Sequence, residues 1–574
     1  MKKIDNWITQ FRSKNKLNKD IELLNSDEIL NEYSTDASIF KVIPNAVIFP
    51  KNKEEIKSVI QFISKNKKKF PQLSITGRAG GTDMTGGSIN EGIILSFTKY
   101  MNKIKSINKI KSKERNKHKQ NSEKYSAVVE PGVYYRDFEK QADHKDLLFP
   151  SYPASKSLCA FGGMIANNCA GEKTLQYGKT NKYVRRLKVI LADGNEYEFK
   201  KLNIDDLNKK LRQKNFEGDI YRKVHRLLED NHEIIEKARP IVSKNSAGYA
   251  LWDVYKKDHN TGKEIFDLTQ LFVGSQGSLG IWTEAEIELV KKKKYSQLIA
   301  CHIKNVNTLS EFVNIVLPFN PESLETFGKK TLFLGLHFLP EIAKKIGVPT
   351  LKLAWQFKDE ALLTLLHGIP KFIVLVLLTD ENKKILNNRI EKLHLELKNN
   401  KVPHLVLTTE EEAEKYWIMR RESFNLLRKK VKDKKATPFI DDFIVKPEFL
   451  PEFMPKLEKI LFDHDVHPTF AGHAGSGNFH IIPLMDLKKE SEREKIPVVC
   501  REVHDLVVKY HGSITAEHND GLIRTPYLEQ MYGKEIIALF EEVKKIFDPL
   551  NMFNPGKKVH GNLEYAMKHI NPER

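Results

Sequence analysis

Two short segments in the last fifth of the chain combine histidines with a carboxylate at close spacing. Residues 471–480 read Ala-Gly-His-Ala-Gly-Ser-Gly-Asn-Phe-His and place His473 and His480 on either side of a glycine-rich turn. The flanking apolar residues favour strands, so a hairpin would bring the two imidazoles together. A later segment adds Glu517 and, directly after it, His518. Two imidazoles and one carboxylate suit a divalent cation such as Zn²⁺, Mn²⁺ or Fe²⁺ and leave positions for a substrate.

The fourth polar group of this set, His518, would then remain free. A neutral imidazole titrates near working pH, so His518 is a candidate general base. Asn478, inside the first turn, is a further polar candidate. A histidine pair around a turn is also a common structural element, so the spacing alone leaves both interpretations open.

A glycine-rich segment much earlier in the chain could bind phosphate. Residues 78–87 read Arg-Ala-Gly-Gly-Thr-Asp-Met-Thr-Gly-Gly between two apolar runs that favour strands. Without Cβ atoms, such a loop can direct several backbone N–H groups at phosphate oxygens. It is not a Walker loop, because no Gly-Lys-Ser/Thr follows, and no helix opens directly after it as in a dinucleotide fingerprint. The plain alternative is a strand-to-strand turn.

Two more segments rich in small residues follow. Residues 157–171 are dense in Gly, Ala, Asn and Ser, which would allow the backbone to lie against a flat ligand, and residues 272–281 form a third glycine segment before a predicted strand. Close packing of helices also requires small residues, so these segments do not settle the question by themselves.

Composition limits the class of protein. With 574 residues, two or three domains are expected. The net charge of +19 comes from lysines spread along the whole chain. This pattern indicates a solvated lysine-rich surface. The alternative is a basic surface that binds an anionic membrane or nucleic acid. The densest basic run, residues 103–124, is typical of an exposed hairpin extension.

The cysteines and apolar runs bear on the compartment. The four cysteines are far apart and form no Cys-x-x-Cys, so the sequence predicts neither an iron–sulfur cluster nor a disulfide framework, as expected in a reducing cytosol. The first residues do not resemble a signal peptide. The most apolar run, residues 372–378, is far shorter than the ~20 residues of a membrane span. We expect a cytoplasmic protein, at most peripheral to the inner face of a membrane.

Hydrophobic periodicity predicts an α+β organisation. Residues 1–40 are predicted to be helical, and a second α+β unit is predicted to begin near residue 291. Predicted strands are residues 46–50, 127–133, 187–191, 285–290, 298–303 and 372–378. Predicted helices are residues 54–65, 135–143 and 410–430 and most of the last eighty residues.

Six segments together, in chain order, are similar to motifs of the FAD-linked D-2-hydroxyacid dehydrogenases. These belong to the vanillyl-alcohol oxidase-like flavoproteins and include D-lactate dehydrogenase, the glycolate oxidase flavin subunit and D-2-hydroxyglutarate dehydrogenase. The resemblance covers about residues 30 to 560. The segments are Arg78–Gly87, Ser157–Gly171, Gly274–Ile281, His473–His480, Glu517–Gly521 and Asn554–Lys557.

The resemblance implies a two-part FAD-binding domain of the vanillyl-alcohol oxidase (PCMH) type with an α+β cap. It predicts an N-terminal helical segment (1–40), an FAD-binding domain (41–290), a cap or substrate domain (291–485) and C-terminal helices closing on the FAD site (486–574). FAD would be non-covalent, because the loop at 78–87 has no histidine to tether it. The residues implied to contact FAD are Arg78, Ala79, Gly80, Gly81, Thr82, Asp83, Gly86, Gly87, Ser157, Gly162, Gly163, Asn167, Asn168, Gly171, Tyr177, Gly178, Gly274, Gln276, Gly277, Gly280, Ile281 and Asn554.

For the reaction, the resemblance implies oxidation of a D-lactate-like 2-hydroxy acid to the 2-oxo acid. His473, His480 and Glu517 would hold the metal, expected to be Zn or Mn, while His518 accepts the hydroxyl proton as hydride passes to flavin N5. Arg420 and, on weaker grounds, Arg524 are candidates for the substrate carboxylate. The expected electron acceptor is a quinone, a cytochrome or an electron-transfer flavoprotein; a homodimer is one expected assembly, and no nucleic-acid partner is expected.

Three residues depart from the family pattern. Gln276 stands for Glu, Ser476 for Asp and Asn519 for Gly, and the last two lie in or beside the metal and substrate motifs. The substrate therefore stays open. One rival hypothesis is an FAD enzyme acting on another alcohol or a sugar acid. Another is a basic surface-binding flavoprotein that has lost catalysis.

Overall fold

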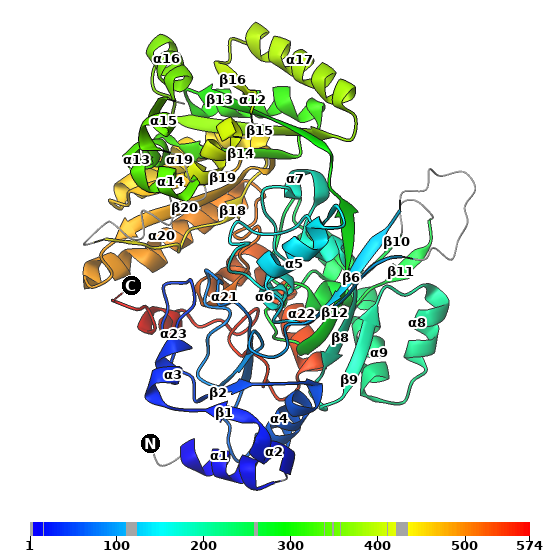
Figure 1. Ribbon diagram of the computed structural model, residues 1–574. Helices are drawn as coiled ribbons and strands as arrows, with labels where there is room; N and C mark the ends of the chain where they lie inside the picture. The colour runs from blue at the N-terminus through cyan, green and yellow to red at the C-terminus, as the bar shows by residue number, and fades with distance from the viewer. Residues whose placement is uncertain are drawn as a thin grey trace.

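The described part of the chain contains three sheets of four, six and eight strands and a two-stranded ribbon. The computed structural model describes residues 4–14, 16–110, 123–257, 262–337, 339–346, 349–355, 357–409, 411–420 and 434–573. Figure 1 shows the eight-stranded sheet at the top, the four-stranded sheet at the bottom and the six-stranded sheet at the right.

The four-stranded sheet has the order β1-β2-β4-β3 and a largely buried interior. Its strands are β1 Glu22–Leu24, β2 Ala46–Phe49, β3 Ile75–Arg78 and β4 Ile93–Ser96. The helices of this lobe are α1 Ile4–Ser13, α2 Lys16–Asp20, α3 Asp27–Glu32 and α4 Lys53–Asn66. The amphipathic helix predicted at 54–65 is confirmed as α4, which buries Ile56, Val59, Ile60 and Ile63. The helical prediction for 1–40 is wrong at β1, where Leu23 enters the core and pairs with β2.

The first glycine-rich segment is not a turn between antiparallel neighbours. β3 and β4 lie side by side and run parallel, with Ile75 opposite Ile93. The chain must therefore return to the start of the sheet before β4 can begin, and residues 79–92 make this return. This requirement explains why the segment is long and irregular, which a tight turn would not be.

The six-stranded sheet is antiparallel and is built around β12. Its strands are β5 Ile104–Lys109, β6 Tyr125–Val129, β7 Leu147–Leu148, β8 Val184–Ile190, β9 Glu196–Lys200 and β12 Ile281–Lys291. The ribbon consists of β10 Tyr255–Lys257 and β11 Glu264–Phe266. The associated helices are α5 Tyr135–Asp143, α6 Phe161–Asn167, α7 Thr174–Tyr177, η1 Thr180–Lys182, α8 Ile204–Leu211, α9 Phe216–Asp230, α10 His232–Ala238, η2 Leu251–Asp253 and α11 Thr269–Phe272. β5 and β6 form the predicted hairpin, whose residues 111–122 lie outside the described part.

The eight-stranded sheet lies in the part of the chain that the sequence predicts to be a cap, and we call this sheet and its helices the cap. Its strands are β13 Tyr295–Ile303, β14 Ser323–Gly328, β15 Phe372–Asp380, β16 His404–Leu407, β17 Lys435–Ala436, β18 Phe443–Ile444, β19 Pro468–His473 and β20 Asn478–Met485. Its helices are α12 Val306–Val316, η3 Leu317–Phe319, α13 Lys329–His337, α14 Leu339–Ile346, α15 Thr350–Trp355, α16 Lys358–His367, α17 Lys383–Asn399, η4 Pro447–Phe449, α19 Leu450–Asp463 and η5 Ala474–Ser476. The predicted buried strand at 372–378 is confirmed as β15, which reads as a continuous apolar run because both of its faces lie in hydrophobic clusters. Of the helix predicted at 410–430, residues 411–420 are helical, and residues 410 and 421–430 lie outside the described part.

The carboxyl-terminal segment ties the lobes together. Its helices are α20 Glu490–Lys509, α21 Gly521–Arg524, η6 Thr525–Tyr527, α22 Leu528–Phe547 and α23 Leu563–Lys568. α22 packs on α9 of one lobe and on α20, which itself packs on α19 of the cap. Phe553 then bridges to Ile75 of β3. Among the described helices, none combines the length and the apolar character needed to cross a membrane.

Candidate active site

The predicted histidine hairpin is present. His473 ends β19 and His480 lies on β20, with η5 forming the turn between the two strands. The register sets His473 opposite Asn478 and Ala471 opposite His480. The two imidazole ring centroids are 5.3 Å apart and the ring planes are nearly perpendicular, at 82°.

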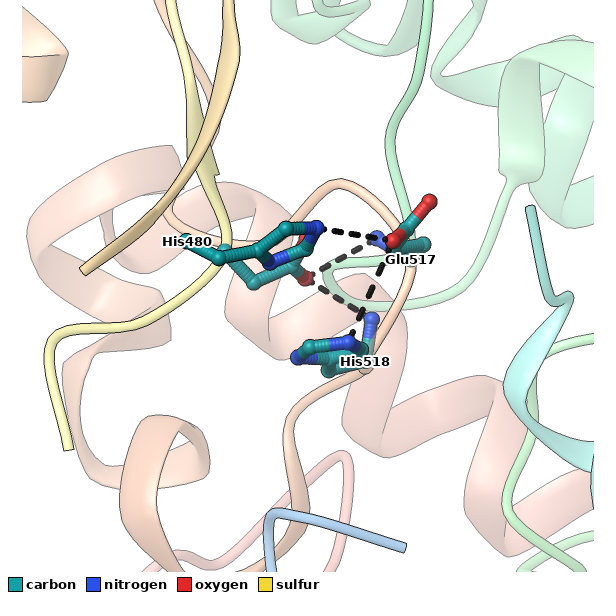
Figure 2. Close-up of side chains that lie close together, drawn as sticks. His480, Glu517 and His518 are labelled. Atoms are coloured by element: carbon teal, nitrogen blue, oxygen red, sulfur yellow. Dashed lines mark hydrogen bonds and ion pairs between the residues drawn. The ribbon is translucent and has the colours of Figure 1, made fainter. Parts of the chain in front are cut away.

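Glu517 completes the group from a segment beyond α20. The Nε2 atoms of His473 and His480 each lie 3.2 Å from Glu517 Oε1. His518 approaches the same oxygen with its Nε2 at 3.9 Å. Figure 2 shows the rings of His480 and His518 stacked beside each other, with dashed lines running to the Glu517 carboxylate. Three imidazole nitrogens thus converge on one carboxylate oxygen.

Two further carboxylates lie behind the imidazoles. His473 Nδ1 lies 2.6 Å from Glu325 Oε1, and His480 Nδ1 lies 3.1 Å from Asp441 Oδ1. A carboxylate at Nδ1 holds the proton on that nitrogen and leaves the Nε2 lone pair directed toward Glu517. Two Nε2 atoms and one carboxylate oxygen are ligand types that suit a divalent cation. The described side chains whose ligand atoms all lie within 4.8 Å of one another are, however, Asp442, His480, Glu517 and His518, and His473 is not among them.

Asp442 stands next to Asp441 but has a different environment. Its Oδ2 accepts hydrogen bonds from the Thr515 hydroxyl (2.7 Å) and from the backbone amides of Ala516 (3.0 Å), Glu517 (2.9 Å) and His518 (2.7 Å). One ligand atom from Asp442 also lies within 4.8 Å of those of His480, Glu517 and His518, so it is a geometrical candidate for the cation. Because its Oδ2 already accepts four hydrogen bonds, we assign Asp442 to holding the 515–518 backbone in place.

The site is electrostatically prepared for a cation. Burial acts to lower the pKa of His480, but Asp441 and Glu517 overcome it and raise that pKa to about 10. Burial acts to raise the pKa of Glu517, whereas Lys244 and His473 bring it well below its ordinary value. The group therefore favours positive charge on its imidazoles beside a carboxylate anion. A divalent cation would supply that positive charge in place of protons.

Several residues of this site carry no recognisable signal in the sequence. Lys244 is buried and its Nζ lies 3.3 Å from Glu517 Oε2 and 3.4 Å from Asn478 Oδ1. One lysine cannot stand out among 94 lysines and arginines. The adjacent pair Asp441-Asp442, in a buried apolar stretch, is the one signal that could have been read, because buried carboxylates are normally paired.

The two candidate arginines lie in different settings. The Arg420 guanidinium is 6% exposed and forms an ion pair with Glu325, the carboxylate that also contacts His473. Arg524 is fully buried, and it donates to the backbone carbonyls of Asn519 (Nη1, 3.1 Å) and Asp441 (Nη2). Arg524 thus holds two backbone segments of the site together, and we do not propose it as a substrate ligand.

The predicted phosphate loop has a preformed shape. Asp83 Oδ2 accepts hydrogen bonds from Thr85 N (3.0 Å), Thr85 Oγ1 (2.7 Å) and Gly87 N (2.6 Å). The backbone amides of Gly80, Gly81 and Thr82 donate no hydrogen bond within the described part of the chain. A Cβ at Gly80 would lie 2.5 Å from the Leu158 carbonyl oxygen, so the loop approaches the second glycine segment closely. Unpaired amides in a glycine loop fit a pyrophosphate.

The other predicted FAD residues fall into two groups, and the residues of the first group are linked to this loop. Asn167 donates to Asp83 (2.7 Å), Gln276 to Asn167 (3.3 Å), and Asn554 to the carbonyls of Gly87 (2.8 Å) and Gln276 (2.7 Å). At Gly163 an added Cβ would meet nothing within 4 Å, which leaves room for a ligand. A Cβ at Gly162 would lie 2.9 Å from that of Ala79, and one at Gly274 would lie 3.2 Å from that of Asn168. Gly86 instead faces Phe40 and Leu522, and at Gly277 an added Cβ would meet nothing within 4 Å.

A second group is engaged elsewhere in this structure. Arg78 donates to the Thr35 carbonyl (2.8 Å) and lies over the Tyr33 ring. Gly171 donates to Thr174, and Gly280 and Ile281 enter the buried start of β12. Ser157 is exposed, Tyr177 ends α7, which contacts β14 of the cap, and Gly178 caps the same helix.

Comparison with known proteins supports this assignment. Residues 44–200 match the FAD binding domain, and residues 295–558 match the C-terminal domain of FAD linked oxidases. The chain is 28% identical over 530 residues to "Glycolate oxidase subunit GlcD" of Bacillus subtilis, covering 92% of this chain and 91% of the relative. It is 24% identical to "D-lactate dehydrogenase" of Archaeoglobus fulgidus, covering 89% and 91%. Against "D-2-hydroxyglutarate dehydrogenase" of Escherichia coli it is 25% identical, but spans only 49% of that longer protein.

Solved structures agree on the fold. The 4-ethylphenol oxidase of Gulosibacter chungangensis superposes with a TM-score of 0.64 at 15% identity, covering 98% of both chains. p-Cresol methylhydroxylase superposes with a TM-score of 0.64 at 14% identity, covering 97% of this chain and 96% of that one. The fold is therefore of the vanillyl-alcohol oxidase or p-cresol methylhydroxylase type. The chain thus carries both the FAD binding domain and the C-terminal domain of FAD linked oxidases, and the relatives that it resembles over most of its length include a D-lactate dehydrogenase and a glycolate oxidase subunit.

Proposed function

We propose that this protein oxidises a small D-2-hydroxy acid, of the size of D-lactate, to the 2-oxo acid. The observation that carries the proposal is the convergence of His473, His480 and His518 on Glu517, each imidazole backed by a carboxylate. The names of the relatives, which include D-lactate and D-2-hydroxyglutarate dehydrogenases, support a 2-hydroxy acid as the substrate class.

When bound, FAD would supply the hydride acceptor for the α-carbon, and a divalent metal, Zn or Mn, would supply a Lewis acid for the hydroxyl group. His473, His480 and Glu517 would hold the metal. Non-covalent binding of FAD is part of the proposal, because the loop at residues 78–87 contains no histidine that could form a covalent bond to the flavin.

His518 is the proposed base. Its Nδ1 lies 2.6 Å from Asp441 Oδ2, off the line of an ideal hydrogen bond, so Nε2 faces the site. Burial acts to lower the pKa of His518, but Asp442 and Asp441 raise it above its ordinary value. An imidazole of raised pKa beside a carboxylate is well suited to receive the hydroxyl proton at Nε2 and to keep it as hydride leaves.

Arg420 is proposed to bind the substrate carboxylate. A guanidinium can hold a carboxylate through two parallel N–H donors, and the ion pair with Glu325 places Arg420 close to His473. Glu325 would then set the position of both Arg420 and His473. Lys244 balances the charge of Glu517, and Asn478 spans from Asp442 Oδ1 (3.2 Å) to Lys244.

The electron acceptor, the assembly and the domain boundaries are part of the same proposal. A cytoplasmic enzyme of this kind needs an acceptor for the flavin electrons, and a quinone, a cytochrome or an electron-transfer flavoprotein fits that chemistry. A homodimer and a peripheral contact with the inner membrane face are the proposed assemblies. We propose functional boundaries of 1–40, 41–290, 291–485 and 486–574.

An anaerobic screen tests the function. The purified yellow protein is mixed with the D- and L-forms of lactate and 2-hydroxyglutarate and with achiral glycolate, and flavin bleaching is followed near 450 nm on the order of seconds to minutes. Bleaching by a D-2-hydroxy acid, lost after chelation and restored by Zn²⁺ or Mn²⁺, is the expected result. Acid precipitation should release the flavin into the supernatant. Bleaching by sugar acids or other alcohols alone would replace the substrate assignment, and a colourless protein that takes up no FAD would overturn the function.

A further inference from the structure

The residues that follow the site pair Glu517-His518 turn directly onto the predicted flavin segments. Asn519 Nδ2 donates to the backbone carbonyls of Asn167 (3.2 Å) and Gly274 (2.9 Å), which belong to two different glycine-rich segments. Asn519 has a φ of 71°, so its backbone is in the left-handed region. A single side chain two positions after Glu517 therefore clasps both flavin segments.

The same turn also meets the phosphate loop. Gly521 N donates to Gln276 Oε1 (2.8 Å), and Leu522 N donates to the Thr85 carbonyl (2.8 Å). A Cβ at Gly521 would lie 2.2 Å from the Thr85 carbonyl oxygen, so only glycine permits this approach. We call residues 519–521, with these contacts, the clasp turn.

The clasp turn is sealed from water on its other side. Asn519, Asp520 and Lys558 are all 0% exposed. Lys558 Nζ pairs with Asp520 Oδ2 (2.7 Å) and donates to Asn519 Oδ1 (2.8 Å). Water cannot reach this buried turn to replace hydrogen bonds that are lost. The turn and the flavin segments are therefore expected to become ordered or disordered together.

From these contacts we propose that the clasp turn couples the metal site to the FAD site, so that each cofactor strengthens the binding of the other. FAD would order the segments at Asn167 and Gly274, to which Asn519 is bonded. The metal would order Glu517, which precedes the same turn. Whichever cofactor binds first meets the ordering cost of the turn, and the second binds to a turn already in place. This inference rests on the proposed function for the presence of both cofactors.

Thermodynamic linkage makes the coupling reciprocal and measurable. Removing the metal should therefore weaken FAD, even though no metal ligand belongs to the predicted FAD residues. Coupling between sites is typically 5–150-fold, and we expect FAD to leave about tenfold faster after chelation. In the reverse direction, the metal should bind about tenfold more weakly after FAD is removed.

The variant Asn519→Gly isolates the clasp. Glycine adopts a φ of 71° without strain, so the backbone turn is retained while the side-chain bonds to Asn167, Gly274 and Lys558 are lost. Asn519→Asp is the second variant: it keeps an acceptor for Lys558 but removes the two donors to the flavin segments. The matched control is Asn320→Gly, an exposed asparagine at φ 50° in the cap.

The experiment follows FAD release from the full-length holoenzyme by the rise of flavin fluorescence on dilution, with Zn²⁺ or with chelator. Wild type and Asn320→Gly should release FAD about tenfold faster in chelator, whereas Asn519→Gly and Asn519→Asp should differ by less than twofold between the two conditions. Metal content is measured on the same samples. If Asn519→Gly does not fold, Asn519→Asp decides.

The outcomes separate the inference from the function. If the wild type binds both cofactors and a 2-hydroxy acid bleaches the flavin, but FAD release ignores the metal, the coupling is refuted and the function stands. Unchanged coupling in Asn519→Asp would also refute the role of the clasp. A wild type that binds no metal refutes the metal site of the proposed function and the coupling with it.

Discussion

His480 and His518 lie stacked, with ring centroids 5.0 Å apart and planes inclined by 20°, and their Nδ1 atoms face the two oxygens of one carboxylate. Asp441, which provides both oxygens, is fully buried. Burial acts to raise the pKa of Asp441, but His518 and His480 lower it below its ordinary value. One anion therefore orients a proposed metal ligand and the proposed base at once.

Asp441→Asn should impair both functions together. The amide keeps the size but loses the charge that fixes the two imidazoles, and loss of such an outer carboxylate typically costs 10–100-fold in metal affinity or activity. Metal affinity is measured by competition with a coloured chelator, and flavin reduction by rapid mixing. Asp380→Asn, on the half-exposed end of β15, is the control. A variant that loses only one of the two properties would show that Asp441 serves one imidazole.

His480→Ala should remove the metal and leave FAD in place. The substitution deletes one of the three proposed ligands, on β20 of the hairpin, so metal content after dialysis should fall at least about tenfold. Elemental analysis and the flavin spectrum are read from the same sample. His464→Ala, which loses only a half-exposed contact with Glu502, should keep its metal. Full metal content in His480→Ala would place the ligand set elsewhere.

His518→Ala should slow flavin reduction by ~10²–10⁴-fold, the usual contribution of a general base. Metal and FAD should remain bound, because neither is assigned to this side chain. Higher pH should partly restore the rate, since a metal-polarised hydroxyl can then lose its proton to solvent. Rapid mixing with the best D-2-hydroxy acid measures the rate. A variant within about threefold of wild type would mean that another group accepts the proton.

His504 should make the fold sensitive to acid. The ring is buried against Tyr527, and burial together with the nearby Arg524 lowers the pKa of His504 to about 3. The unfolded chain binds a proton near pH 6.5 but the folded chain does so only near 3, so stability is lost as the pH falls between these values. At pH 5 this single group should cost about 2 kcal/mol relative to pH 7.5.

The test compares the free energy of unfolding at pH 7.5 and pH 5.0 in wild type, His504→Leu and His467→Gln. His504→Leu should lose less stability on acidification than wild type, because the titrating group is gone. His467→Gln changes an exposed histidine and should behave like wild type. An equal acid response in His504→Leu would assign the loss to other groups.

The sequence by itself determined the features that depend on near neighbours. The alternation of apolar residues predicts α4, and the unbroken apolar run predicts β15. His473 and His480 are joined by a tight strand–turn–strand, so their meeting follows from local hydrogen bonding alone. A high density of glycines likewise marked the segments whose backbones pack closely against one another. The six motifs in order predicted the FAD-linked family, and the comparisons confirm it.

Only the tertiary structure decided the contacts between distant segments. Glu325 lies 148 residues before His473 and Lys244 lies 273 residues before Glu517, and no local pattern links members of such pairs. The packing of the cap sheet against the carboxyl-terminal segment turns Asp441 toward the imidazoles and Asp442 toward the backbone amides. It likewise buries Arg524 behind the site. These roles depend on which way each side chain points once separate sheets have packed, and one-dimensional spacing does not contain that direction.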